Sequence, residues 1–121
     1  MEESEIYIYR YDQPISQSLK EVVEERQRQI ESEGFDKAHD LEHDPGELSG
    51  AGAAYALRAS LDLCPGMNCL DEDIPPPGWP LGSWSLEWWK PTTSRRNLVK
   101  AAALIIAELE RMEAEETREV I

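Results

Sequence analysis

The stretch from Ser94 to Glu113, SRRNLVKAAALIIAELERME, constrains the fold more than any other part of the chain. Its apolar residues recur three and four positions apart, which gives a helix one apolar face made of Leu98, Ala101, Ala102, Ile105, Leu109 and Met112. The opposite side is apolar too, with Ala103, Leu104, Ile106 and Ala107. A helix that is apolar nearly all round is buried on most sides. The sequence therefore predicts a central helix over residues 94–115 that also joins the subunits of a dimer or higher oligomer.

Length and charge limit the possible partners. At 121 residues the chain predicts a single domain over residues 1–121. Its net charge of −13 repels duplex nucleic acid and anionic membrane surfaces, and no apolar run approaches the roughly 20 residues of a membrane span. The first residues lack the pattern of a signal peptide, so we expect a cytoplasmic protein with Cys64 and Cys69 as free thiols.

Two more helices are predicted before the central one. The first covers residues 16–33, with Ser18 and Glu21 fitting a capping box at its start. Arg26 falls near the apolar stripe of this helix, so it must be paired or reach a polar site. The second covers residues 45–62 and is rich in glycine and alanine, which lets another helix or a ligand come close to its backbone, and helix packing is the favoured reason.

Two segments lie outside these helices. Residues 5–11, EIYIYRY, alternate with a period of two and predict a β-strand. Residues 63–93 form a long loop that holds most of the prolines and all four tryptophans. The tryptophans should pack this loop over the helices, and one or two could offer a flat face to a base. The predicted fold is mainly α, a three-helix core with an N-terminal strand and a long Trp/Pro-rich loop, assembled as an oligomeric bundle.

The segment between the first two helices carries the densest chemistry. His39 and His43 lie four apart, each followed by an aspartate, and on a helix both imidazoles would share one face. Asp44 and Glu47 lie three apart at the start of the second helix. Together with the two cysteines the histidines could form a zinc site, but their order and spacing match no zinc module.

An ordered series of motifs resembles a known family. The series runs ERQRQIESEGF, HDLEHDPGEL, AAYAL, WWKP and RRNLVKAAALIIAELER, over residues 24 to 112. It is similar to a family of small proteins of phages and prophages. The resemblance implies an accessory protein in the cytoplasm of an infected or lysogenic bacterial host, with anti-defence sequestration of a host signal as one possible use.

The helix layout is also similar to that of the MazG-like all-α nucleoside triphosphate pyrophosphohydrolases. Those enzymes bind Mg²⁺ with carboxylates from two facing helices, in ExxE and ExxD patterns. Asp44 and Glu47 could form the first pair, but the late helix offers only Asn97 and Lys100 for the second. Since a magnesium centre needs several oxygen ligands, half of the set is missing. The resemblance therefore favours a relative that binds a nucleotide without hydrolysing it and without a cofactor.

Three hypotheses follow from these patterns. The leading one is binding of a small nucleotide-like, phosphate-bearing ligand. Its predicted site consists of Arg26, His39, Asp40, His43, Glu47, Trp88, Trp89, Lys90, Arg95 and Arg96. In it the arginines contact phosphate, the histidines contact phosphate or ribose, and a tryptophan stacks on the base. The alternatives are a Mg²⁺-dependent pyrophosphohydrolase that uses Asp44 and Glu47, and an acidic protein that inhibits a basic partner.

Overall fold

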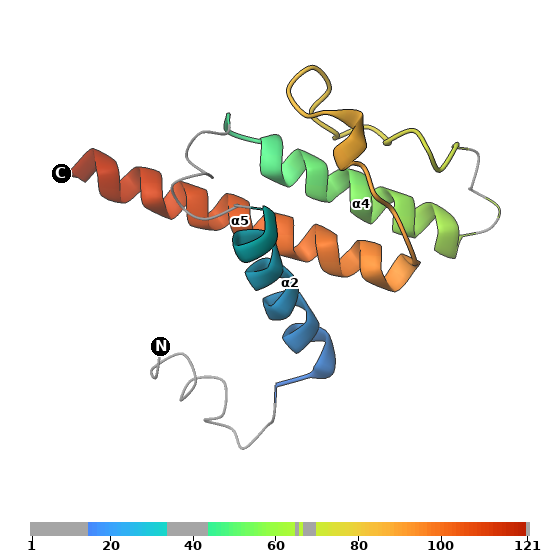
Figure 1. Ribbon diagram of the computed structural model, residues 1–121, viewed down its shortest axis with the longest axis horizontal. Helices are drawn as coiled ribbons and strands as arrows, with labels where there is room; N and C mark the ends of the chain where they lie inside the picture. Colours follow the sequence, from blue (N-terminus) through green and yellow to red (C-terminus); the bar gives the residue numbers. More distant parts are fainter. Residues whose placement is uncertain (1–14, 34–43, 65, 67–69, 121) are drawn as a thin grey trace.

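The computed structural model describes residues 15–33, 44–64, 66 and 70–120. Its elements, in chain order, are helix α2 (Gln17–Glu33), helix α4 (Glu47–Leu63), the 3₁₀ turn η2 (Leu86–Trp88) and helix α5 (Ser94–Val120). Figure 1 shows α4 and α5 side by side, with α2 against the other side of α5. None of the helices in the described ranges is long and apolar enough to cross a membrane.

Helices α4 and α5 pack antiparallel and form the centre of the fold (Figure 1). Small residues allow them to approach closely. A Cβ added to Gly52 would lie 3.0 Å from the backbone oxygen of Ala101 and 3.4 Å from Cβ of Leu104. Gly52 therefore lies at a close helix contact, as the sequence predicts for the small residues of α4. Any side chain at this position would meet the backbone of α5.

The start of α4 is capped by a residue of α5. Gly46, at the N-cap position, has φ of 92° and no side chain to cap the helix. Oε1 of Glu108 instead accepts hydrogen bonds from the backbone N–H groups of Gly46 and Ser49, both at 3.1 Å, and from the Ser49 hydroxyl at 2.9 Å. Oε2 of Glu108 accepts from Nε of Arg111 at 2.6 Å. A carboxylate is favourable at this position because the N-terminal N–H groups of a helix have no partners within it.

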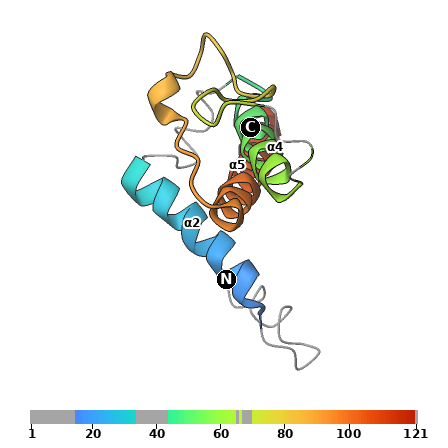
Figure 2. The same ribbon diagram turned by 90° about the vertical axis from the view of Figure 1, so that its right-hand side faces the viewer.

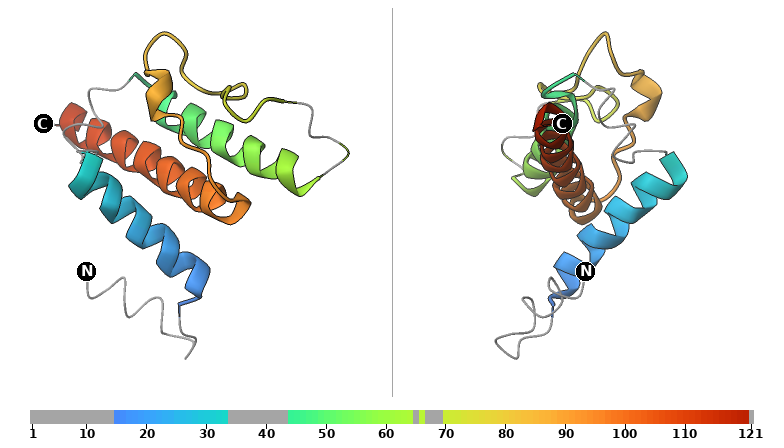
Figure 3. Two further views of the ribbon diagram at one scale, coloured as in Figure 1. Left: turned by 45° about the vertical axis from the view of Figure 1, so that its right-hand side comes forward. Right: turned by 90° about the vertical axis from the view of Figure 1, so that its left-hand side faces the viewer.

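Helix α2 contacts α5 and, among the described elements, no other helix. It leans across α5 at an angle, as Figures 2 and 3 show. Ion pairs join the two helices at separate points, Arg26 to Glu110 at 2.7 Å and Arg95 to Glu21 at 3.0 Å. Arg26 is buried and paired, as expected for an arginine beside an apolar stripe.

The segment of residues 70–93, here called the Trp segment, runs back along α4 before the chain enters α5 (Figure 1). It comes so close to α4 that a Cβ added to Gly50 would lie 2.4 Å from the backbone oxygen of Gly78. Gly78 has φ of 112°, a conformation that residues with a side chain rarely adopt. Two glycines, one from each segment, therefore make this contact possible.

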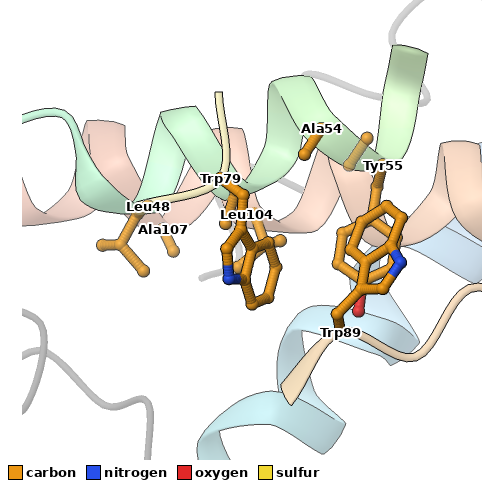
Figure 4. Close-up of a cluster of buried hydrophobic side chains, with 9 residues drawn as sticks. Leu48, Ala54, Tyr55, Trp79, Trp89, Leu104 and Ala107 are labelled. Atoms are coloured by element: carbon orange, nitrogen blue, oxygen red, sulfur yellow. The ribbon is translucent and has the colours of Figure 1, made fainter. Parts of the chain in front are cut away.

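Aromatic rings attach the Trp segment to the helices (Figure 4). The rings of Tyr55 and Trp89 lie 4.6 Å apart, and Trp79 contacts Trp89 edge to face at 5.4 Å. The Tyr55 hydroxyl donates to the backbone oxygen of Trp88 at 3.1 Å and accepts from the backbone N–H of Lys90 at 2.9 Å. These buried aromatic rings, together with the two hydrogen bonds of the Tyr55 hydroxyl, hold the segment in place over the helices.

The helical part of the predicted fold agrees with the structure, but the strand is wrong. The described elements are all helices, against predicted ranges of 16–33, 45–62 and 94–115. Residues 5–11, on which the strand was predicted, lie outside the described residues. A strand needs the edge of another strand for its backbone hydrogen bonds, and residues 15–33, 44–64, 66 and 70–120 offer none. Alternation of side chains is a local pattern and does not supply that partner.

Candidate functional site

A pocket of about 300 Å³ lies between α2, the α4–α5 pair and the Trp segment. In Figure 2 the η2 turn and α2 lie on the same side of the α4–α5 pair, and both contribute to the pocket. Its walls combine basic and aromatic side chains. The lining residues are Glu25, Arg28, Gln29, Tyr55, Trp79, Trp84, Trp88, Lys90, Thr92, Arg96, Lys100 and Leu104. This volume is at the lower end of the range for small-molecule sites.

The charge of the pocket is opposite to that of the whole chain. Its lining holds four cationic side chains and one carboxylate, a surplus of three positive charges in a protein whose net charge is −13. The cations come from three parts of the chain, α2, the Trp segment and α5. Cations gathered from separate segments in an acidic protein favour an anionic ligand at this place.

Glu25 organises the basic side of the pocket. Its side chain is buried and accepts from Nε and the terminal nitrogen of Arg28 at 2.8 and 2.7 Å, and from the Gln29 amide at 3.1 Å. The Arg96 guanidinium also donates to this carboxylate. Burial raises the pKa of Glu25, but the hydrogen bonds and charges of Arg28 and Arg96 outweigh it and hold the pKa below its usual value. Glu25 thus fixes two guanidinium groups at the wall of the pocket.

Two lysines complete the basic lining. Nζ of Lys100 donates to the backbone oxygen of Lys90 at 2.6 Å and lies 5.4 Å from the centre of the Tyr55 ring. Nζ of Lys90 lies 5.7 Å from the centre of the Trp88 ring. Each ammonium group is thus within cation–π distance of an aromatic face. The pocket can contact a negative group and a flat ring at the same time.

Three of the ten predicted ligand-binding residues line this pocket, namely Trp88, Lys90 and Arg96. Trp89 lies beside it in the aromatic core, where its Nε1 donates to the backbone oxygen of Glu72 at 2.9 Å. Arg96 and Arg95 are neighbours in sequence, yet only Arg96 reaches the pocket. Successive helix residues point about 100° apart, which explains the difference.

The other predicted residues lie elsewhere. Arg26 pairs with Glu110, and Arg95 pairs with Glu21 and Ser18 on the exposed side of α2. Glu47 accepts the backbone N–H of Asp44 at 3.0 Å, the role of a residue in the first turn of a helix. The remaining three, His39, Asp40 and His43, lie outside the described residues.

Several residues that line the pocket were not predicted as ligand-binding residues. The missed residues are Glu25, Arg28, Gln29, Tyr55, Trp79, Trp84, Thr92, Lys100 and Leu104. Lys100 carried a signal, because a lysine at the edge of an apolar helical run needs a polar environment. Glu25 and Arg28 carried none, because they stand in a dense row of charges on α2 that looks like a solvated face.

The residues of the magnesium hypothesis do not face one another as carboxylate pairs. Asn97, in the position of the second pair, is buried and accepts the backbone N–H of Thr92 at 2.8 Å. Lys100 lines the basic pocket. Glu108, the carboxylate of α5 nearest the start of α4, is bound by Gly46, Ser49 and Arg111. No group of three or more His, Cys, Asp or Glu side chains that could hold a metal occurs within the described ranges.

Comparisons with protein-family models, curated proteins and solved structures gave no match to this chain.

Proposed function

We propose that the protein binds a small nucleotide-like ligand through its phosphate and its base, and sequesters it in the pocket between α2, α5 and the Trp segment. The observation that carries this proposal is the surplus of positive charge beside aromatic faces in a chain of net charge −13. A basic surface alone would suit any anion, and an aromatic surface alone any flat molecule. Their combination in one pocket suits a ligand with both parts.

The proposed contacts follow from the lining. Arg28 and Arg96 present planar guanidinium groups, which bind phosphate oxygens in forked geometry, while Lys100 adds a compact charge. Trp88 lines the pocket and is 39% exposed, and we propose that its ring stacks on the base. A pocket of about 300 Å³ suits a single nucleotide unit better than a polymer.

The biological setting of the proposal comes from the resemblance of residues 24 to 112 to the phage family. On that basis the protein acts in the cytoplasm of a bacterial host and withdraws a signalling nucleotide from the host's defence. Hydrolysis of the ligand is the alternative activity. It would use Asp44 and Glu47, and we expect no release of pyrophosphate from common nucleoside triphosphates. Inhibition of a basic partner by the acidic surface is the third hypothesis.

The proposal is tested by calorimetry and thermal shift with a panel of nucleoside mono-, di- and triphosphates and signalling dinucleotides, with and without Mg²⁺. Lys100→Met and Arg96→Gln should each lower the affinity for the ligand found by at least about tenfold, the loss expected for one charged hydrogen bond. Arg95→Gln is the matched control, because Arg95 precedes Arg96 but pairs with Glu21 outside the pocket.

Two results would contradict the proposal. One is that no nucleotide raises the melting temperature. The other is that Arg95→Gln weakens binding as much as Arg96→Gln, which would place the ligand elsewhere. Turnover that disappears in Asp44→Asn or Glu47→Gln would instead favour the hydrolase.

A further inference from the structure

Helix α5 carries an apolar stripe that the described part of the chain leaves exposed. The side chains of Leu98, Ile105, Leu109 and Met112 are between 45% and 52% exposed, and Ala102 lies among them. These five residues follow one another at intervals of four, three, four and three. That alternation is the heptad spacing by which one helix packs along another.

The stripe is separate from the pocket. Lys100 and Leu104, which line the pocket, lie on the opposite side of α5 from Leu98 and Leu109 by helical geometry. Glu108 of α5 binds the start of α4, and Glu110 of α5 binds Arg26 of α2. By helical geometry these two glutamates lie on the two flanks between the pocket side and the stripe, so α4 and α2 occupy those flanks. A partner on the stripe would therefore leave the pocket open.

We propose that the occupant of the stripe is the α5 helix of a second copy of this chain, packed antiparallel. In the register we infer, Leu98 faces Leu109 of the partner and Ala102 faces Ile105 of the partner. The two-fold axis passes between the Ala102–Ile105 layer and its symmetry-related copy. The smallest side chain of the stripe then faces a branched one, so the stripe is complementary to itself. The leucine, alanine and isoleucine layers are thus matched by apolar side chains, while Met112 at the end of the stripe lies beside Arg95 of the partner.

Charge favours the antiparallel direction. Arg95 lies in the first turn of α5, and its side chain is 60% exposed beyond the Leu98 end of the stripe. The other end carries the exposed carboxylates Glu113 and Glu116. An antiparallel pair brings the basic start of each helix beside the acidic end of the other. A parallel pair would place like charges together and would align the two helix dipoles.

The first test is the mass in solution by light scattering at micromolar concentration. We expect a dimer of the 13.8 kDa chain. Leu109→Glu places charges in the apolar layers and should give a monomer with unchanged circular dichroism. Leu57→Glu is the matched control, because this leucine is also exposed but belongs to α4 and lies outside the stripe. A wild-type monomer, or a dimer that persists in Leu109→Glu, would overturn the proposal.

The second test fixes the direction and does not depend on a destabilised variant. In a background of Cys64→Ser and Cys69→Ser, copies with Leu98→Cys are mixed with copies with Leu109→Cys and mildly oxidised. Antiparallel pairing predicts a disulfide between the two different copies and none when Leu98→Cys is oxidised alone. Cross-linking of Leu98→Cys to itself would show a parallel pair. Absence of cross-links in the mixture would remove the proposed interface.

Discussion

At the scale of single residues, Glu108 links two helices that are far apart in sequence. Its carboxylate accepts hydrogen bonds from the N-terminus of α4, although Glu108 lies 62 residues after Gly46 in the sequence. Burial raises the pKa of Glu108, but hydrogen bonds from Arg111 and Ser49 outweigh this and lower the pKa below its usual value. The ionised form is therefore part of the folded structure.

Replacement of Glu108 tests this link. Glu108→Ala leaves the N–H groups of Gly46 and Ser49 without their acceptor and the buried Arg111 without one of its carboxylates. We expect the free energy of unfolding to fall by about 3 kcal/mol, as for other broken buried pairs. Urea titration measures this loss. Glu24→Ala, an exposed glutamate on α2, should change it by less than about 0.5 kcal/mol. Equal effects would contradict the capping role.

The buried carboxylates also predict how stability depends on pH. The pKa values of Glu25 and Glu108 are both lowered from 4.5 on folding, so the unfolded chain binds protons more readily. Their contribution is present above pH 4.5 and is lost as the pH falls through the lower pKa values of the folded state. Urea titrations at pH 7 and pH 3.5 should show a smaller loss of stability on acidification for Glu25→Gln than for the wild type. An identical loss would show that other groups control acid unfolding.

At the scale of elements, the contact between α4 and the Trp segment depends on Gly50. Ala usually stabilises a helix by about 1 kcal/mol relative to Gly. In Gly50→Ala, however, the new Cβ would lie 2.4 Å from the backbone oxygen of Gly78, which cannot move without displacing the segment. We expect a lower melting temperature and weaker ligand binding. Ser60→Ala, at an exposed position of the same helix, gains only helix propensity and should be neutral or stabilising. A stabilised Gly50→Ala would contradict the close contact.

Helical periodicity predicts the helices because each pattern lies within one element. The ends are less predictable. Ser16, whose Oγ accepts the backbone N–H of Leu19 at 3.1 Å, caps α2 in place of the predicted Ser18. Both serines precede suitable residues, so the local pattern does not distinguish between them. The strand prediction failed for a related reason, because pairing of strands depends on segments that the local pattern does not include.

At the scale of the whole molecule, the pocket depends on the arrangement of segments that are far apart in sequence. Helix α2 crosses α5 on the side where the Trp segment runs back along α4, and these segments line the pocket together. Arg96 lies 71 residues from Glu25, which binds it. Local sequence patterns do not reveal a contact between residues so far apart in the chain. Trp88, Lys90 and Arg96 could therefore be predicted for the site only from their residue types. The role of Glu25 in fixing Arg28 and Arg96 could not be predicted without the crossing.

The separation of charge over the molecule makes a kinetic prediction. The chain as a whole repels an anionic ligand at long range, while the pocket attracts it at short range. Raising ionic strength from about 0.01 to 0.15 M shortens the Debye length from about 30 to 8 Å and screens the long-range repulsion first. The association rate constant should therefore rise with salt, measured by tryptophan fluorescence in stopped flow. A rate constant that falls steeply with salt would show that attraction by the basic pocket outweighs repulsion by the net negative charge of the chain.

The capping of α4 by Glu108 also concerns the order in which a ribosome makes this protein. Synthesis proceeds from the N-terminus, so α4 is complete while most of α5 has not yet been translated. During that interval the N–H groups of Gly46 and Ser49 have no carboxylate, and the small residues of α4 have no helix against which to pack. Stable tertiary structure is therefore expected only after α5 has emerged from the ribosome, and until then the small residues of α4 stay exposed.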